Sequence, residues 1–199
     1  SAQDQFAIRS HQKAAAAQAA GNFDQEIIVL SNAPLVTADN NIRPDANVST
    51  MAKLKPAFKK AGSVTAGNSS PITDGASAIL VVSEKFALAN GLKPLAIVRS
   101  FADVGCNPEI MGMGPVGASK KALERTGLTI RDIGVVELNE AFAAQALACI
   151  QELGLNPEKV NLDGGAIALG HPLGGSGSRI TGHLANVMDR EDVQYGLSS

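Results

Sequence analysis

The sequence is poor in aromatic and sulfur-containing side chains: it has no tryptophan, one tyrosine and two cysteines among 199 residues. The cysteines, Cys106 and Cys149, lack the spacing of metal or redox sites, and their small number suits a reducing compartment. No apolar run approaches the roughly 18 residues of a membrane helix, and no signal segment begins the chain. We therefore expect no metal site, no membrane span and a cytoplasmic location.

An excess of charge of one sign is also lacking, because the formal net charge is −2 at pH 7. This balance provides no electrostatic footprint for general nucleic-acid binding. Apolar residues make up 45% of the chain and charged residues 18%, which is typical of a globular protein and not of a disordered one. A chain of this length can bury one good core or two small ones.

Short apolar segments alternate with helix-compatible segments along the chain. The segments with strand character are residues 26–30, 77–83, 95–101 and 135–138. The expected helices are an alanine-rich one that starts at a Ser1–Asp4 capping box, then 51–54, 84–90, 118–126, 140–153 and one from near residue 176. This alternation predicts an α/β fold with βαβ units on a mainly parallel sheet.

The stretch from Gly164 to Arg179, GGAIALGHPLGGSGSR, holds six glycines in sixteen residues. Glycines at this density let a backbone turn tightly and approach other groups closely. His171 lies between Gly170 and Pro172, and imidazole exchanges a proton near neutral pH. Two interpretations remain open from spacing alone: a catalytic histidine before a helix N-terminus, or a packed histidine in a tight turn. A nucleotide site is disfavoured, because the stretch lacks the Walker and Rossmann patterns.

Four sequence blocks together resemble the C-terminal half of the thiolases. They are VTAGNSSPITDGASA (64–78), MGMGPVGAS (111–119), NEAFAAQ (139–145) and the glycine-rich stretch, and they occur in the order and at the spacing of that family. The resemblance covers essentially the whole chain. VGCNPEIMG and the ending DREDVQYGLSS are most similar to the branch that degrades 3-ketoacyl-CoA in bacterial fatty-acid β-oxidation.

The resemblance implies the thiolase fold, with a mainly parallel sheet of the five-stranded type. It also implies a division of the chain, and the GLKP turn at residues 91–94 suggests the same main boundary. Residues 1–72 would be part of the CoA-binding loop domain, 73–92 the last strand and helix of the N-terminal domain, and 93–199 the C-terminal domain. The chain would end before the family's final cysteine motif, and the rest of the N-terminal domain would be absent.

By resemblance, the parent protein is an acyltransferase that cleaves 3-ketoacyl-CoA with CoA. CoA is then a substrate and no other cofactor is expected. Expected partners are acyl-CoA and CoA, the missing N-terminal domain, further copies of the chain and a β-oxidation multienzyme complex. Two alternatives stay open: a biosynthetic acetyl-CoA acetyltransferase, and a non-catalytic CoA-binding or assembly piece.

The resemblance also assigns roles to side chains. His171 matches the histidine that activates the nucleophilic cysteine and helps to bind the thioester oxygen. Asn139 matches the asparagine that positions a water in an oxyanion hole, although a plain helix N-cap is the alternative. Glu140, expected on the first helical turn, is a catalytic candidate of lower rank. Phe142 and Ser70 match residues near the pantetheine of CoA; taken alone, they are a core side chain and a loop hydroxyl.

Neither cysteine matches a catalytic cysteine of the family. Cys149 lies on an apolar stripe of the helix predicted over 140–153 and is expected to behave as a small core residue. Cys106 is in a loop without a neighbouring cation that would lower its pKa. The basic residues near the loop domain have two interpretations, a solvated face or a contact with CoA phosphates: Lys53, Lys55, Lys59, Lys60 and, more weakly, Arg43.

Overall fold

The computed structural model describes all residues, 1–199. Its α-helices are α1 (Ala2–Ala19), α2 (Val48–Met51), α3 (Glu84–Ala89), α4 (Gly114–Thr126), α5 (Ala143–Leu153), α6 (Ala166–Leu169) and α7 (Leu173–Arg190). Its strands are β1 (Val135–Glu137) and β2 (Gly196–Ser198). Short 3₁₀-helices occupy Ala66–Asn68, Pro108–Met113, Ile130–Asp132 and Pro157–Lys159, and the second of these is kinked at Ile110. No helix combines the length and apolarity needed to span a bilayer.

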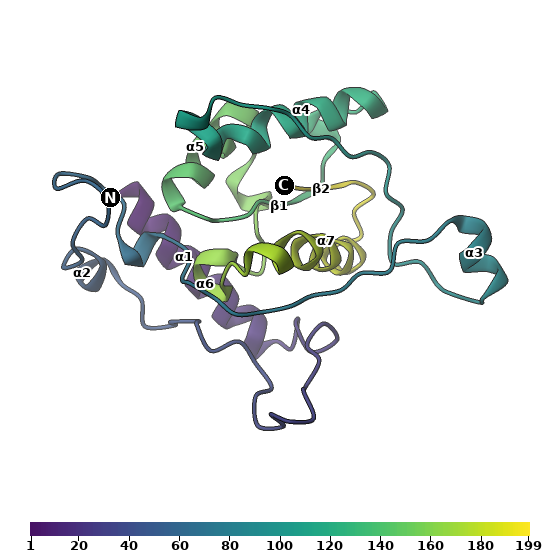
Figure 1. Cartoon of the computed structure of the whole chain (residues 1–199), viewed down its shortest axis with the longest axis horizontal. Helices are drawn as coiled ribbons and strands as arrows, with labels where there is room; N and C mark the ends of the chain where they lie inside the picture. Colours follow the sequence, from purple (N-terminus) through teal and green to yellow (C-terminus); the bar gives the residue numbers. More distant parts are fainter.

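The two strands run parallel between two layers of helix (Figure 1). Val136 belongs to the larger core together with Cys149 and Ile150 of α5, whereas Val135 packs with Leu184 of α7. Successive strand residues point to opposite faces, so β1 is buried on both faces, as is typical of parallel sheets, whereas β2 is half-buried. An isolated parallel bridge joins Val136 to Val160 as well. The predicted α/β character and parallel pairing are thus confirmed.

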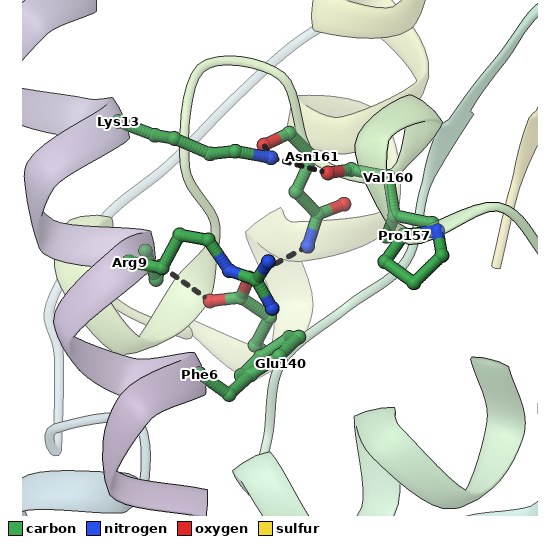
Figure 2. A pocket seen from close by; sticks show the side chains of 8 residues that line it. Phe6, Arg9, Lys13, Glu140, Pro157, Val160 and Asn161 are labelled. Atoms are coloured by element: carbon green, nitrogen blue, oxygen red, sulfur yellow. Dashed lines mark hydrogen bonds between the residues drawn. The ribbon is translucent and has the colours of Figure 1, made fainter. Parts of the chain in front are cut away.

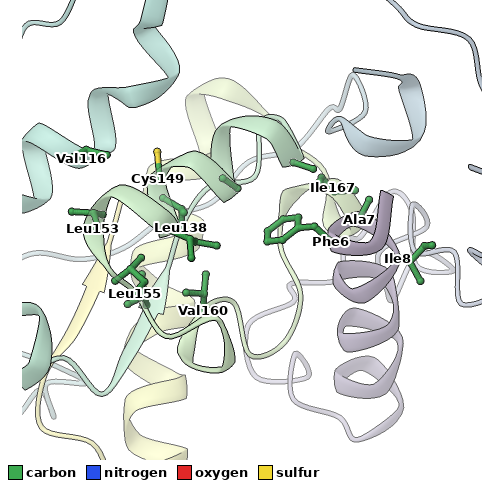
Figure 3. Close-up of a cluster of buried hydrophobic side chains, with 14 of the residues drawn as sticks. Phe6, Ala7, Ile8, Val116, Leu138, Cys149, Leu153, Leu155, Val160 and Ile167 are labelled. Carbon is green, nitrogen blue, oxygen red and sulfur yellow. The ribbon is translucent and has the colours of Figure 1, made fainter. Parts of the chain in front are cut away.

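The main core joins α1 to the strand and helices of the C-terminal half (Figure 3). Phe6 and Ile8 come from α1, more than 120 residues before Leu138 and Leu153, which lie in the same cluster. Burial of side chains of this size stabilises a fold by roughly 1.5–3 kcal/mol each. Residues 1–19 and 133–167 therefore fold as one packed body.

Several local predictions are confirmed. The Ser1–Asp4 capping box begins α1. Gly127 and Gly154 end α4 and α5 in the left-handed conformation, with φ of 70° and 65°. Cys149 is fully buried. Strong end signals in the sequence thus identify where these helices begin or end.

Three of the four predicted strands are wrong. Residues 26–30, 77–83 and 95–101 make no strand pairing, and most apolar side chains in the latter two segments are exposed. Their β-branched composition indicates a capacity for burial, but a strand also needs a neighbour that takes its backbone hydrogen bonds. No other strand lies beside these segments within the chain.

The predicted helix at 51–54 is displaced, because Asn47 and not Ser49 provides the cap. The Asn47 Oδ1 atom accepts hydrogen bonds from the backbone amides of Ser49 and Thr50, so α2 starts at Val48. Helix α4 starts at Gly114, four residues earlier than predicted, with Pro115 in its first turn, a position that proline favours.

Candidate active site

In the glycine-rich stretch, the backbone closely approaches other residues at two glycines, Gly165 just before α6 and Gly170 just after it. At Gly165, a Cβ atom would lie 2.3 Å from Cδ of Glu140, so only glycine lets that carboxyl group approach. At Gly170, φ is +103° and a Cβ atom would lie 2.5 Å from Cγ2 of Thr73. Glycine is required at 170 both for its backbone conformation and for this close contact. His171 therefore lies in the short turn between α6 and α7.

The backbone of His171 is fastened to a segment far away in the sequence. Its amide donates a hydrogen bond to Oγ1 of Thr73 at 3.1 Å. Further along the same extended segment, the Ser77 hydroxyl donates to the Gly175 carbonyl in the first turn of α7. Residues 73–77 therefore lie along the beginning of α7 and fix the turn that carries the histidine.

Helix α7 starts at Leu173, with Pro172 as its N-cap, and not near Ser176 as predicted. Gly174, Gly175 and Gly177 consequently lie inside the helix and form no loop. The expectation failed because glycine lowers helix propensity, while here the packing of the helix against other segments outweighs that cost.

Asn139 and His171 are brought together, as the family resemblance implies. Nδ2 of Asn139 lies 3.4 Å from Nδ1 and 3.3 Å from Nε2 of His171. Asn139 is not a helix N-cap, because α5 begins four residues later at Ala143. Its backbone amide instead donates to the Ser199 carbonyl at 2.8 Å, which continues the pairing of β1 with β2. The end of the sheet thus positions the asparagine.

The environment of His171 favours a neutral imidazole. Burial, and then the positive charge of Arg179 on α7, lower the pKa of His171 below its ordinary value. The hydroxyl of Ser176 lies 2.6 Å from Nδ1 of the ring. A neutral ring that is oriented by its neighbours can accept a proton from a thiol, which is the chemistry required of a general base.

Glu140 is enclosed and does not lie on a helix, which corrects its predicted position on the first turn of α5. Its carboxyl group accepts hydrogen bonds from Oγ of Ser10 (2.7 Å), Nδ2 of Asn161 (2.7 Å) and the amide of Ile167 (3.2 Å). Figure 2 shows Glu140 and Asn161 pointing toward each other beside α1. Burial raises the pKa of Glu140, and these hydrogen bonds oppose that rise. Such contacts favour a structural link between three segments.

The two predicted CoA-side residues lie next to the same loop. Both the amide and the hydroxyl of Ser70 donate to the Ala141 carbonyl, at 3.0 and 3.2 Å. Phe142 is half-buried, and its ring meets that of Phe58 edge to face at 5.9 Å. Residues of the segment 58–70 thus contact Ala141 and Phe142 of the NEAF block, while the roles of Ser70 and Phe142 toward CoA remain predictions.

The cysteines are placed as the sequence predicts. Sγ of Cys149 lies 3.3 Å from the Gly112 carbonyl, and burial raises the pKa of this thiol. A buried thiol with a raised pKa is a poor nucleophile. Cys106 is exposed in its loop. Neither cysteine makes a hydrogen bond to His171.

The sequence does not predict the residues that hold or polarise the candidate site residues without being candidates themselves. Thr73, Ser176 and Ser10 act through single hydroxyl groups, and Arg179 through its charge. Thr73 and Ser176 lie inside blocks that were recognised, but serine and threonine are common in loops and early helical turns. No spacing signal distinguishes these hydroxyls from their neighbours.

A buried ionic cluster lies apart from the site and was also not predicted. His183 of α7 lies 2.8 Å from Glu26, 3.4 Å from Asp163 and 4.0 Å from Glu137. Burial opposes a charge on His183, but these carboxylates outweigh it and raise the pKa of His183 to about 10. Arg190 pairs with Asp163 at 2.6 Å. The cluster ties residue 26, after α1, to the last long helix.

Fold and site together define an α/β protein with a histidine–asparagine pair held against parallel strands. Comparison with known sequences specifies the family. The profile of the thiolase N-terminal domain matches residues 1–85, and that of the thiolase C-terminal domain matches residues 92–199. The chain belongs to the thiolase family.

Individual relatives agree with this assignment. A 3-ketoacyl-CoA thiolase of Yersinia pestis (strain Pestoides F) is 55% identical over 99% of this chain and 54% of its own length. The crystal structure of human mitochondrial 3-ketoacyl-CoA thiolase in complex with CoA matches with a TM-score of 0.94 at 44% identity, over 98% of this chain and 50% of that chain. The Bacillus anthracis acetyl-CoA acetyltransferase matches with a TM-score of 0.92 at 40% identity, over 100% and 52%. The chain spans about half the length of the curated relatives that it matches.

Proposed function

We propose that the native protein is a 3-ketoacyl-CoA thiolase of fatty-acid β-oxidation. It would transfer the acyl group of a 3-ketoacyl-CoA to CoA, which yields acetyl-CoA and an acyl-CoA shortened by two carbons. The observation that carries the proposal is the Asn139–His171 pair, with Nδ2 of the amide 3.3 Å from Nε2 of the ring, inside blocks that match the thiolase domains. The 55% identity to the Yersinia pestis thiolase supports the substrate class.

In this proposal His171 takes the proton of a cysteine thiol, so that the thiolate attacks the 3-keto carbon. A neutral ring is the form that can do so, and the lowered pKa of His171 supports that state. The Oδ1 atom of Asn139 makes no hydrogen bond within the chain. It is therefore available to a water that donates to developing negative charge in the oxyanion site.

The attacking sulfur is proposed to come from outside residues 1–199. Cys149 is buried with a raised pKa, and Cys106 makes no contact with His171. We propose the same division of the chain as the resemblance implies: residues 1–72 in the CoA-binding loop domain, 73–92 completing the N-terminal domain and 93–199 in the C-terminal domain. CoA and acyl-CoA are the proposed ligands, with no metal or other cofactor.

We propose that the native protein is cytoplasmic and homo-oligomeric, and that a β-oxidation multienzyme complex contains it as one component. The CoA bound to the human thiolase supports CoA as the ligand class. Sedimentation of the native protein, alone and in cell extract, tests both assemblies: a monomer in each would contradict them.

The decisive experiment is a product analysis. Purified native protein is incubated with a long-chain 3-ketoacyl-CoA and CoA, and the thioesters are separated and weighed by mass spectrometry. The proposal predicts one acetyl-CoA for each shortened acyl-CoA. A protein that leaves these substrates intact but acts on acetoacetyl-CoA contradicts the degradative assignment.

The second candidate is a biosynthetic acetyl-CoA acetyltransferase, which condenses two acetyl-CoA molecules. The observation in its favour is the Bacillus anthracis enzyme of that name, whose fold matches almost as well as that of the human thiolase. Both reactions use the same histidine and asparagine positions, so these two residues do not distinguish them. The chain-length profile of the product analysis does.

The third candidate is a non-catalytic CoA-binding or assembly role for residues 1–199 alone. The buried Cys149 and the isolated Cys106 support it. Loss of a nucleophile lowers rates by several orders of magnitude, so this chain alone is expected to show no thiolytic turnover. Intact-mass analysis after incubation with an acyl-CoA checks this, and a stable acyl adduct on Cys106 would overturn the assignment.

A further inference from the structure

Ser176 occupies the first turn of α7 with its side chain buried against Nδ1 of the His171 ring. Its Oγ atom lies 2.6 Å from Nδ1 of His171 and 3.0 Å from the Pro172 carbonyl oxygen. A serine hydroxyl carries one hydrogen and two lone pairs, so it can donate to only one of these neighbours. The direction of this short chain of hydrogen bonds decides which nitrogen of the ring carries the proton.

We infer the direction from the Pro172 carbonyl, which accepts the Ser176 hydroxyl at 3.0 Å beside the backbone amides of Gly175 and Ser176. Pro172 lies four residues before Ser176, and a helical serine commonly donates to the carbonyl of residue i−4. With the hydroxyl hydrogen on the Pro172 oxygen, only lone pairs of Oγ face the ring. Nδ1 of His171 is then the donor to Ser176, and Nε2 is left without a proton.

No other side chain contact settles the tautomer. Asn139 places its Nδ2 almost equally far from both ring nitrogens, at 3.4 and 3.3 Å. The lone pairs of the two nitrogens point in different directions, so one amide group in this position cannot lie along both. Thr73 binds the backbone amide of His171 and not its ring.

We propose that Ser176 is a positioning residue that holds His171 as the Nδ1–H tautomer and confines proton exchange to Nε2. The proposal rests on the proposed thiolase function. In both the neutral and the protonated ring, Nδ1–H donates to the same hydroxyl, so the ring gains and loses its Nε2 proton without rearrangement of Ser176. A thiol that gives its proton to Nε2 therefore meets a partner that is already oriented.

The tautomer is measured directly by ¹⁵N NMR of histidine-labelled native protein, because protonated and unprotonated imidazole nitrogens have well-separated shifts. The His171→Asn spectrum identifies the His171 signals. The proposal predicts a protonated Nδ1 and an unprotonated Nε2 above the pKa of the ring. The reverse pattern in the unsubstituted protein overturns the proposal, whether or not any variant folds.

The variants test the consequence for catalysis. Ser176→Ala should lower kcat about 10- to 100-fold with little change in KM, and should move the acidic limb of the kcat profile down by about one pH unit, because the imidazolium loses an acceptor. Ser176→Thr retains a hydroxyl and should restore most of both. Thr181→Val removes a hydroxyl of the same helix that donates to the Gly177 carbonyl and should leave the His171 signals unchanged.

Different results would contradict the role of Ser176 and the thiolase function. Unchanged kcat, pH profile and tautomer in folded Ser176→Ala contradict the role of Ser176 while the thiolase proposal stands. A protein with Nδ1–H at His171 but without activity on any 3-ketoacyl-CoA contradicts the thiolase proposal and leaves the tautomer assignment intact.

Discussion

The hydroxyl of Thr73 accepts a hydrogen bond from the backbone amide of His171 at 3.1 Å, across 98 residues of sequence. Gly170, the residue before His171, packs its bare Cα against the same threonine. The position of the histidine is therefore set from the loop-side segment as well as from α7. A single side chain of the 64–78 block, far from His171 in the sequence, helps to orient the ring.

Thr73→Val keeps the shape of this side chain but removes its acceptor. We expect kcat of the native protein to fall about 5- to 10-fold, the scale of one lost hydrogen bond, with KM nearly unchanged. Steady-state kinetics measure this, and Thr73→Ser serves as the control that retains the hydroxyl. A full kcat in Thr73→Val beside a lowered kcat in Thr73→Ser would show that the methyl contact, and not the hydrogen bond, matters.

Asn139→Ala tests the oxyanion role separately from base catalysis. The variant should lose turnover by about 100-fold or more, because transition-state stabilisation is removed. The rate at which iodoacetamide alkylates the catalytic cysteine near pH 7 should stay almost constant, since His171 still activates the thiol. Asn156→Ala, which changes an exposed 3₁₀-helix cap, is the matched control. Slower alkylation in Asn139→Ala would contradict the separation of roles.

Glu140→Gln tests whether this carboxyl group is structural. Glutamine places an NH₂ group where the carboxylate accepts from Ser10, Asn161 and Ile167, so at least one donor is left facing a donor. The free energy of unfolding should fall by about 1–3 kcal/mol, measured by urea denaturation. Glu152→Gln on the exposed face of α5 should change it by less than about 0.5 kcal/mol. Unchanged stability with a large loss of turnover would instead assign Glu140 to the reaction.

The His183 cluster predicts how stability depends on pH. The pKa of His183 is about 10 in the folded protein, above its ordinary value of 6.5. Its contribution is therefore complete below pH 6.5 and is lost as pH rises toward 10, at up to about 1.4 kcal/mol per pH unit. Burial raises the pKa of Glu137 to about 7, which adds a decline between pH 4.5 and 7. Urea unfolding at several pH values measures the slope.

Two variants isolate the source of that slope. His183→Asn should be less stable at pH 6.5 and should lose most of the decline between pH 6.5 and 9.5. His11→Asn is the matched control, because burial lowers the pKa of this second buried histidine and it adds no slope in that range. A decline that persists in His183→Asn would contradict the assignment.

Local sequence signals predicted those parts of the fold that depend on local chemistry. The capping box at Ser1 and the left-handed glycines 127 and 154 act within a few residues, so their effect is readable from the chain. The segments 77–83 and 95–101 show the opposite case. Their composition favours strands, but pairing depends on a neighbour that composition does not specify.

In the candidate site, too, local sequence blocks were informative and long-range contacts were not. The blocks around His171 and Asn139 identified both residues, and the structure brings them within 3.4 Å of each other. The predicted position of Glu140 on a helix is wrong. Helical periodicity extends back from α5 to residue 140, but hydrogen bonds from Ser10 and Asn161 hold Glu140 outside the helix. Contacts across more than 100 residues leave no periodic signal.

Whether His171 acts as the base is decided by His171→Ala in the native protein, with kcat and melting temperature measured together. If His171 is the base, kcat falls about 10²- to 10⁴-fold, the scale of a lost general base, and cysteine alkylation near pH 7 slows. The melting temperature should change by only a few degrees. An unchanged kcat in a protein with a lowered melting temperature would instead show that His171 is a packed turn residue without a catalytic role.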